Sequence, residues 1–348
     1  MICLSISFLP AIFQICNFLS ILYQNTLMLT ITTRRSILRF YILLSFFLLF
    51  TITFGCLIMS MMIHLAQQAD HNSISDYILT ALGAFIIFLG IYSVYSFYRN
   101  SPTITVDHNS ISFNSDKYNW ADIKEITLTG KQPFKSAFAQ PMEGAKFTCS
   151  DGTERYMFDY MYANAPQVKS FIQQVVIDKS NFNPLPDTKT SKAELDNEDF
   201  ETFKDPQLTS FRGITCWGLV GIMAFASVAN FNNKGYSGAY IFAGTSSALW
   251  LVFHGWLMHN FKVSQNFLVI KDHIFFWQNT PFRFSDIKEV VFETRQKQPN
   301  SLRVITKDFH SKLYPAGTLR DKTWLLMKDK LESCGVKVRN ECIPENPA

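Results

Sequence analysis

Long apolar runs and short alternating stretches divide the chain into two kinds of segment. Four runs are long and apolar enough to cross a bilayer, whose hydrocarbon core of about 30 Å needs about 20 residues of helix. These runs cover residues 40–63, 77–98, about 213–231 and about 239–258. Short polar loops at 64–76 and 232–238 join them in pairs. The pattern therefore predicts two transmembrane helical hairpins.

A pattern typical of β-strands follows each predicted hairpin. In the first such region, apolar Ile104, Val106, Ile111 and Phe113 alternate with polar residues, and 145–158 reads as a β-hairpin. In the second region, strands are expected in 267–279, 282–296 and 301–315. Each region ends in an amphipathic stretch, at 165–179 and at 319–335, which predicts a closing helix. The fold class expected is an α+β membrane protein.

The order of these patterns predicts the domain boundaries. They are an apolar N-terminal segment (1–33), a first hairpin (34–100), a first β module (101–180), a linker (181–210), a second hairpin (211–260), a second β module (261–340) and a tail (341–348). The N-terminal segment has no basic region of the kind that opens a cleavable signal peptide. Two interpretations of it stay open, a fifth membrane helix or a true translation start at Met28.

One phrase occurs in both modules, as "WADIKEI" at 120–126 and "FSDIKEV" at 284–290. Asp122 aligns with Asp286, and Ile123 aligns with Ile287. An Asp between two strands commonly accepts a hydrogen bond from a backbone N–H about two residues on, which closes a tight turn. A metal-binding or catalytic role is not favoured, because neither Asp has a His or a second carboxylate at ligand spacing. The phrase therefore predicts a structural turn in each of two copies of a hairpin-plus-module unit.

The distribution of charge predicts the orientation of the hairpins. Charged residues make up 17% of the chain, below the roughly 25% of a soluble domain. Arg34, Arg35 and Arg39 precede the first apolar run and Arg99 follows the second, while the loop between them has no Lys or Arg. Positive residues stay on the cytoplasmic side of a membrane. Both modules are therefore expected to face the cytoplasm.

Several function classes are not supported by the sequence. The net charge of +4 and the interleaved basic and acidic residues do not suggest nucleic acid as a partner. No phosphate-binding loop, dinucleotide fingerprint or His-Glu-x-x-His motif is present, and the seven cysteines form no Cys-x-x-Cys pair. We therefore predict no catalytic, cofactor-binding or metal-binding residues, no cofactor and no enzyme activity.

In this arrangement the chain resembles the bacterial pleckstrin-homology-like membrane proteins. In that family one or two transmembrane hairpins precede a strand-rich domain closed by a C-terminal helix, and an aromatic-x-Asp-Ile step recurs. The resemblance implies two copies of a transmembrane hairpin, each followed by a cytoplasmic, partly open β-barrel or sandwich with a C-terminal helix. It also implies a multi-pass protein of the bacterial inner membrane.

The resemblance also suggests where partners would bind. Eukaryotic pleckstrin-homology domains often bind phosphoinositides through basic residues in a strand loop. The comparable residues here are Lys131 and Lys135 in the first module and Arg295 and Lys297 in the second. They are candidate contacts for anionic membrane lipid or for a protein partner.

Three functions are compatible with these patterns, and the least favoured, a membrane enzyme with an unfamiliar site, would need a polar cluster that only the fold brings together. We favour a non-enzymatic interaction or regulatory scaffold that binds lipid or protein partners, or assembles as a homo-oligomer in the membrane. The alternative is a transporter or channel component that the cytoplasmic modules gate. It would need a polar path through the membrane, yet no Asp, Glu, Lys or Arg lies deep in the four runs.

Overall fold

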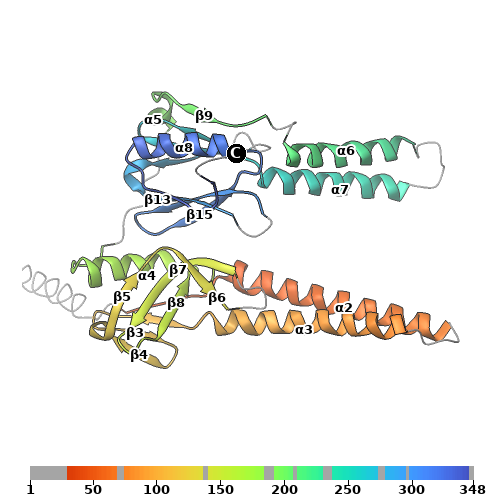
Figure 1. Ribbon diagram of the computed structural model, residues 1–348, viewed down its shortest axis with the longest axis horizontal. Coiled ribbons are helices and arrows are strands. Elements are labelled where there is room, and N and C mark those ends of the chain that lie inside the picture. The colour runs from red at the N-terminus through yellow and green to blue at the C-terminus, as the bar shows by residue number, and fades with distance from the viewer. Residues whose placement is uncertain are drawn as a thin grey trace, which may run out of the picture. The chain divides into compact units, whose positions relative to one another are not determined.

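The structure, a computed structural model, divides into two compact units, Met1–Pro184 (unit 1) and Leu185–Ala348 (unit 2) (Figure 1). It describes residues 30–68, 74–135, 140–183, 192–206, 210–229, 237–272, 279–294 and 298–344. Most of the N-terminal segment, 1–29, lies outside the described residues, so both interpretations of it stay open. Arg295 and Lys297 also lie outside the described residues.

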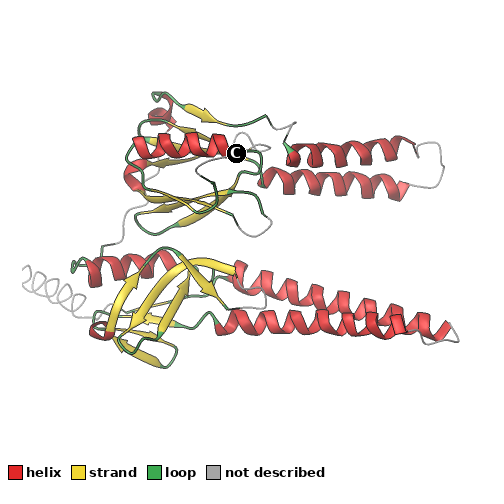
Figure 2. Ribbon diagram, in the orientation of Figure 1, coloured by secondary structure: helices red, strands yellow, loops and turns green. Residues whose placement is uncertain are grey.

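Unit 1 combines a long helical hairpin with short strands (Figure 2). A π-helical turn, η1 (Ile37–Ile42), leads into α2 (Leu43–Gln68), which is followed by α3 (Ile74–Arg99). The strands are β1 (Ile31–Thr32), β2 (Ile104–Val106), β3 (Ser110–Phe113), β4 (Asp116–Asn119), β5 (Ile123–Thr127), β6 (Lys131–Phe134), β7 (Gln140–Cys149) and β8 (Glu154–Phe158). A 3-10 turn, η2 (Trp120–Asp122), separates β4 from β5, and the helix α4 (Ala165–Phe171) continues as the π-helical η3 (Ile172–Ile177).

Two open sheets enclose the core of unit 1. One has the strand order β1-β2-β3-β4, and in the other β5, β6 and β8 all pair with β7. The fully buried Ile104, Ile111, Phe147 and Phe171 come from both sheets and from α4. The β-hairpin predicted in 145–158 is present, and its turn uses Gly152 at φ +82°, a conformation that glycine adopts without strain. The alternation in the sequence therefore did identify which side chains face the core.

Unit 2 has the same kinds of elements. Its helices are α5 (Lys192–Asp196), α6 (Phe211–Ala229), α7 (Ser237–Trp256) and α8 (Asp321–Ser333). Its strands are β9 (Glu201–Phe203), β10 (His259–Val263), β11 (Phe267–Asp272), β12 (Asn279–Arg283), β13 (Ile287–Glu293), β14 (Ser301–Thr306), β15 (Ser311–Pro315) and β16 (Val338–Asn340), with the 3-10 turn η4 (Phe284–Asp286) between β12 and β13. The sheets have the orders β12-β11-β10-β9 and β15-β14-β13-β16. The described strands thus form open sheets in both units, and they close no barrel.

The core of unit 2 is centred on Trp324 of α8. This side chain is fully buried, with its ring centroid 5.6 Å from that of Phe261 and 4.8 Å from that of Phe292. Because Phe261 belongs to β10 and Phe292 to β13, one residue of α8 joins both sheets. The predicted closing helix therefore does cover the core with its apolar stripe.

In one sheet of each unit, the first strand in the sequence precedes the hairpin, which was not predicted. β1 precedes α2 and pairs with β2, which follows α3. β9 precedes α6 and pairs with β10, which follows α7. The sequence pattern had assigned these two strands to the N-terminal segment and to the linker. The structure assigns them instead to the sheets, so each hairpin is an excursion between two neighbouring strands.

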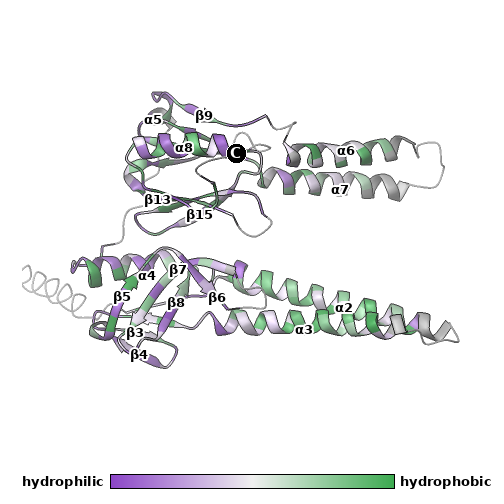
Figure 3. Ribbon diagram, viewed as in Figure 1, coloured by the Kyte–Doolittle hydropathy of each residue, from purple (hydrophilic) through white to green (hydrophobic). Residues whose placement is uncertain are grey.

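Two of the described helices are long and apolar enough to cross a membrane, by length and composition (Figure 3). They are Ile37–His64 and Tyr77–Arg99, which correspond to the first predicted hairpin. In the second hairpin the apolar stretch among the described residues is shorter, Arg212–Phe225. Membrane association is thus weakly supported for unit 1, while four spans remain a prediction.

Candidate functional site

The two helices of the first hairpin are packed closely through glycine. A Cβ atom placed on Gly55 would lie 2.7 Å from the carbonyl oxygen of Gly83, and one on Gly83 would lie 2.8 Å from the carbonyl oxygen of Gly55. Close backbone approach of this kind is a common way to join helices in a membrane, where the apolar side chains gain little from contacting each other. The outer surface of the hairpin exposes large apolar side chains, among them Phe46, Leu49, Phe85 and Phe88.

Arg35 connects the two ends of this hairpin and the segment that follows it. Its Nε and Nη2 donate to the carbonyl oxygen of Ser101 at 3.1 and 2.7 Å. Its guanidinium also lies 5.2 Å from the ring centroids of both Phe40 and Tyr98. Phe40 belongs to η1 and Tyr98 to α3, so a single side chain connects the start and the end of the hairpin. Such a delocalised cation can satisfy carbonyl and aromatic partners at the same time.

Residues that follow the sheets complete the same attachment. The Asn164 side chain accepts a hydrogen bond from the Arg34 backbone N–H at 2.7 Å and donates to the Thr32 carbonyl at 2.9 Å. The Tyr162 hydroxyl donates to the Pro102 carbonyl at 2.5 Å. Burial raises the pKa of Tyr162, so the phenol keeps its proton and remains a donor. The hairpin base is therefore held by the sheet, by the loop before α4 and by its own two ends.

The β6–β7 arm also reaches the hairpin base. Asn100, directly after α3, donates from Nδ2 to the Lys135 carbonyl at 2.7 Å and to the Ser96 carbonyl at 2.7 Å. The rings of Phe97 and Phe134 meet edge to face with their centroids 5.1 Å apart. These contacts bring the end of β6 against the end of α3.

Four exposed basic residues lie at or beside the ends of this hairpin, and we call them the hairpin-base basic surface. They are Arg34, Arg39, Arg99 and Lys135. The Arg39 guanidinium lies 4.9 Å from the ring centroid of Tyr160. The resemblance points to Lys135 but not to the arginines, and the hydrogen bond from Asn100 to the Lys135 carbonyl connects this residue to the end of α3, next to Arg99. The signal of the arginines in the sequence was the basic flank of an apolar run.

The other predicted contact residues lie elsewhere. Lys131 is half-buried in β6, where it is opposite Glu143 of β7. Lys131 is therefore a strand residue, whereas the resemblance implied a residue in a loop. It is not one of the four residues of the hairpin-base basic surface. The corresponding residues of the second module, Arg295 and Lys297, are outside the described part of the chain.

The repeated phrase forms the turns η2 and η4. The backbone carbonyl of Asp122 accepts hydrogen bonds from the Ser150 N–H and from the Ser150 hydroxyl, at 2.8 Å each. The Asp286 carbonyl accepts from the Lys307 N–H at 2.8 Å in the same way. Ile287 is buried in the core of unit 2, and Ile123 is half-buried. In both turns it is the carbonyl that ties the phrase to the next β-hairpin.

The base of the second hairpin is also anchored to its sheet, but by different residues. A Cβ atom on Gly317 would lie 2.2 Å from Cδ of Arg212, so the Arg212 stem crosses bare backbone there. The Gly317 N–H donates to the Leu257 carbonyl at 3.0 Å, directly after α7. His259 is buried, and its Nδ1 donates to the Pro315 carbonyl at 2.8 Å. Burial lowers the pKa of His259, although that carbonyl and Asp272 oppose the shift, so the ring is neutral near pH 7.

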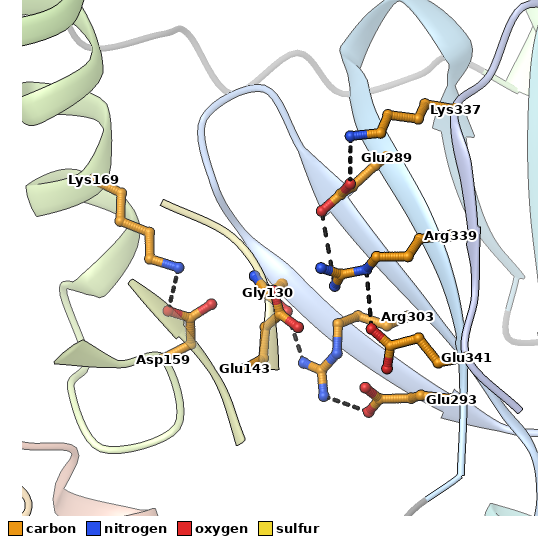
Figure 4. A network of polar contacts seen from close by, with 11 residues as sticks. Gly130, Glu143, Asp159, Lys169, Glu289, Glu293, Arg303, Lys337, Arg339 and Glu341 are labelled. Atoms are coloured by element: carbon orange, nitrogen blue, oxygen red, sulfur yellow. Dashed lines mark hydrogen bonds and ion pairs between the residues drawn. The ribbon is translucent and has the colours of Figure 1, made fainter. Parts of the chain in front are cut away.

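Charged side chains of unit 2 are paired along its second sheet (Figure 4). Arg303 of β14 donates to Glu293 of β13 at 2.6 Å, and Glu289 of β13 lies 3.2 Å from Nζ of Lys337. Among the described residues, no three His, Cys, Asp or Glu side chains are grouped so that they could hold a metal ion. These ion pairs connect neighbouring strands.

No protein-family profile matches the chain, and no curated protein matches its sequence. The best-supported site is the anchored hairpin base of unit 1, where a long apolar hairpin, a sheet and a basic surface meet.

Proposed function

We propose that the chain is a multi-pass integral membrane protein that holds two pleckstrin-homology-like modules at the cytoplasmic face of a bacterial inner membrane. In this role it is a non-enzymatic scaffold that brings lipid or protein partners together. The observation that carries the proposal is the pairing of β1 with β2 across the whole first hairpin.

This pairing restricts the topology. The Thr33 N–H donates to the Ile104 carbonyl at 2.8 Å, and the Ile104 N–H donates to the Thr33 hydroxyl at 2.8 Å. The start of η1 and the end of α3 are therefore tied to the same strand pair. A hairpin with both ends fixed in one place must enter and leave a membrane from one side. The pairing of β9 with β10 supports the same topology for unit 2.

The hairpin-base basic surface supports the cytoplasmic side and a lipid partner. The cytoplasmic leaflet is anionic and attracts basic side chains near its surface by about 1 kcal/mol each. Arg34, Arg39 and Arg99 flank the spans, and Lys135 is brought beside them by the β6–β7 arm. Arginine binds phosphate oxygens through two parallel hydrogen bonds, which suits a lipid headgroup.

The order of elements supports two copies of one module. β1 to β4 and β9 to β12 each form a four-stranded sheet with an excursion after the first strand. A 3-10 turn with the shared Asp-Ile-Lys-Glu sequence then leads into β5 or β13. Both pairings that follow have an irregularity at the same place, between Ile123 and Glu125 and between Ile287 and Glu289. Duplication of one unit accounts for this agreement.

Reporter fusions test the proposal. A reporter that is active only outside the cytoplasm is fused after Ser73, after Lys189 and at the C terminus. Activity is expected after Ser73 alone, and a cytoplasmic reporter is expected to show the reverse pattern. Extracytoplasmic activity after Lys189 or at the C terminus would overturn the proposed topology.

A further inference from the structure

The matched strands β5 and β13 differ in how many neighbours they have. Each begins with the sequence Ile-Lys-Glu after a 3-10 turn, and each pairs with an antiparallel strand, β7 or β14. β13 also has β16 on its other side, in parallel orientation. Among the described strands, β5 is the end strand of its sheet. The outer edge of β5 therefore has no partner strand in the part of the chain that the structure describes, whereas the matching edge of β13 in unit 2 is paired with β16 of the same unit.

β16 is held on β13 by backbone bonds and by charge. The Val290 N–H donates to the Lys337 carbonyl at 2.9 Å, and the Glu341 N–H donates to the Phe292 carbonyl at 2.9 Å. The Glu289 carboxylate lies 3.2 Å from Nζ of Lys337 and 3.8 Å from Nη2 of Arg339 (Figure 4). Lys337, directly before β16, and Arg339 within it thus both lie near Glu289 of β13. Arg339 also pairs with Glu341 at 3.1 Å.

The two units differ in the path of the chain after their last helices. In unit 2, Gly335 at φ +80° ends α8 and turns the chain toward β16. In unit 1 the chain after η3 folds back on the helix, since Gln174 accepts from the Asn183 N–H at 2.6 Å and donates to its carbonyl at 3.0 Å. Phe182 packs on Phe171 with ring centroids 5.4 Å apart. Residues 178–183 are therefore occupied at the helix and do not pair with β5.

β5, which no described strand pairs on its outer edge, has an acidic residue where β13 has Glu289. Glu125 occupies the position of Glu289 in the shared phrase and follows the same irregularity in the strand pairing. Glu289 is only 2% exposed, whereas Glu125 is exposed to solvent. Protein surfaces normally protect a strand edge, because its unpaired backbone groups invite another strand.

We propose that the outer edge of β5 binds an extended segment of a partner protein, which runs parallel to β5 and carries basic side chains at alternate positions. The backbone groups of β5 supply the affinity and Glu125 selects the basic side chains, as in other complexes formed by strand addition. The geometry of β16 on β13 provides the template for this partner. Such a segment would be one class of partner for the proposed scaffold, and this proposal rests on the scaffold function.

A peptide that copies β16 provides the test. The probe is a fluorescent peptide of residues 335–344 with Cys342→Ser, titrated into the full-length chain in detergent micelles. We expect saturable binding and slower amide hydrogen exchange in fragments that cover β5. Glu125→Lys is expected to weaken binding by about tenfold or more, because it replaces attraction by repulsion. The exposed neighbour Lys124→Gln is the matched control and should leave the affinity within about twofold.

Three results would overturn the inference. The first is equal binding by the wild-type chain and Glu125→Lys. The second is protection from exchange confined to β13, which would mean that the peptide displaces β16. A peptide with Glu in place of both basic residues should not bind, and binding equal to that of the basic peptide would also contradict the inference. The reporter fusions address the membrane topology separately, so either proposal can fail without the other.

Discussion

Ile31, which precedes the first hairpin, is paired with Val106, which follows it. Both side chains are buried, and next to them the buried Thr33 hydroxyl accepts a hydrogen bond from the Ile104 N–H. The sheet of unit 1 therefore needs chain from both sides of the hairpin. A displacement of either helix end acts directly on a strand pair.

The close approach of α2 and α3 predicts a strong effect of added volume at Gly83. Gly83→Leu places side-chain atoms where the Gly55 carbonyl and the Met59 side chain already lie. Overpacking of this kind costs about 1–3 kcal/mol. Gly244→Leu in α7 is the matched control, because a Cβ there meets no described atom within 4 Å. Unfolding in mixed micelles should show a loss for Gly83→Leu and little change for Gly244→Leu. Equal losses would contradict the packing.

The neighbouring arginines at the hairpin base are expected to behave differently. Arg35→Ala removes two hydrogen bonds to Ser101 and both ring contacts, so unit 1 should lose about 1–3 kcal/mol of stability. Arg35→Lys keeps the charge but not the planar donors and should recover only part of this loss. Arg34→Ala should change stability little, because its side chain is exposed. Thermal unfolding compares the three, and a similar loss for Arg34→Ala would contradict the anchoring role.

His259 predicts a pH dependence for unit 2. Burial lowers its pKa in the folded state below the ordinary value of 6.5, against the opposing effects of Pro315 and Asp272. Below pH 6.5 the His259 ring is protonated in the unfolded chain, while in the folded chain it stays neutral to a lower pH. The contribution of His259 is therefore complete above the ordinary pKa and is lost as the pH falls below it. His259→Gln should flatten the dependence of the melting temperature between about pH 5.5 and about pH 7.5. An unchanged slope would contradict this assignment.

The hairpin-base basic surface predicts a preference for anionic lipid. The chain in nanodiscs with anionic lipid should be more thermally stable than in neutral nanodiscs, by about 1 kcal/mol for each basic side chain at the surface. The triple variant Arg34→Gln, Arg99→Gln, Lys135→Gln should lose most of this difference. As a control, Lys117→Gln, Lys124→Gln, Lys179→Gln removes three exposed lysines from other parts of unit 1. If both triple variants lose the extra stability in anionic nanodiscs equally, the hairpin-base basic surface is not the lipid contact.

Much of the fold follows from local sequence patterns. Alternation placed Ile104, Ile111 and Phe113 on the core face, and helical spacing placed Trp324 and Leu331 there as well. These signals act over a few residues, and burial reinforces each of them. β1 and β9 escaped prediction because two or three residues carry no period, and their partners lie beyond a complete hairpin. β16 was missed for a similar reason, because its three half-buried residues, Val338, Arg339 and Asn340, show no alternation of apolar and polar side chains that is long enough to recognise.

The site was only partly predictable. Arg34, Arg39 and Arg99 are visible in the sequence as flanks of apolar runs, but their neighbour Lys135 is brought to them by a hydrogen bond from Asn100 to its carbonyl. That contact involves the backbone, so no residue type at position 135 signals it. The role of the Asp122 carbonyl was hidden in the same way, because the carboxylate was the more obvious acceptor.

The pairing of β1 with β2 can be tested directly by a cross-link. Thr32 and Thr105 are opposite each other in the two strands, with their hydroxyl oxygens 3.3 Å apart. Cysteines are placed at both positions in a chain whose native cysteines are Ser, with a protease site inserted after Ser73. Oxidation in native membranes followed by cleavage should leave the two fragments joined on a non-reducing gel and separate after reduction. The pair Thr32→Cys, Lys117→Cys lies across three strand spacings of about 4.8 Å and should not cross-link. Fragments that separate without reduction, or that join equally in the control, would contradict a sheet whose first two strands lie on either side of the apolar hairpin.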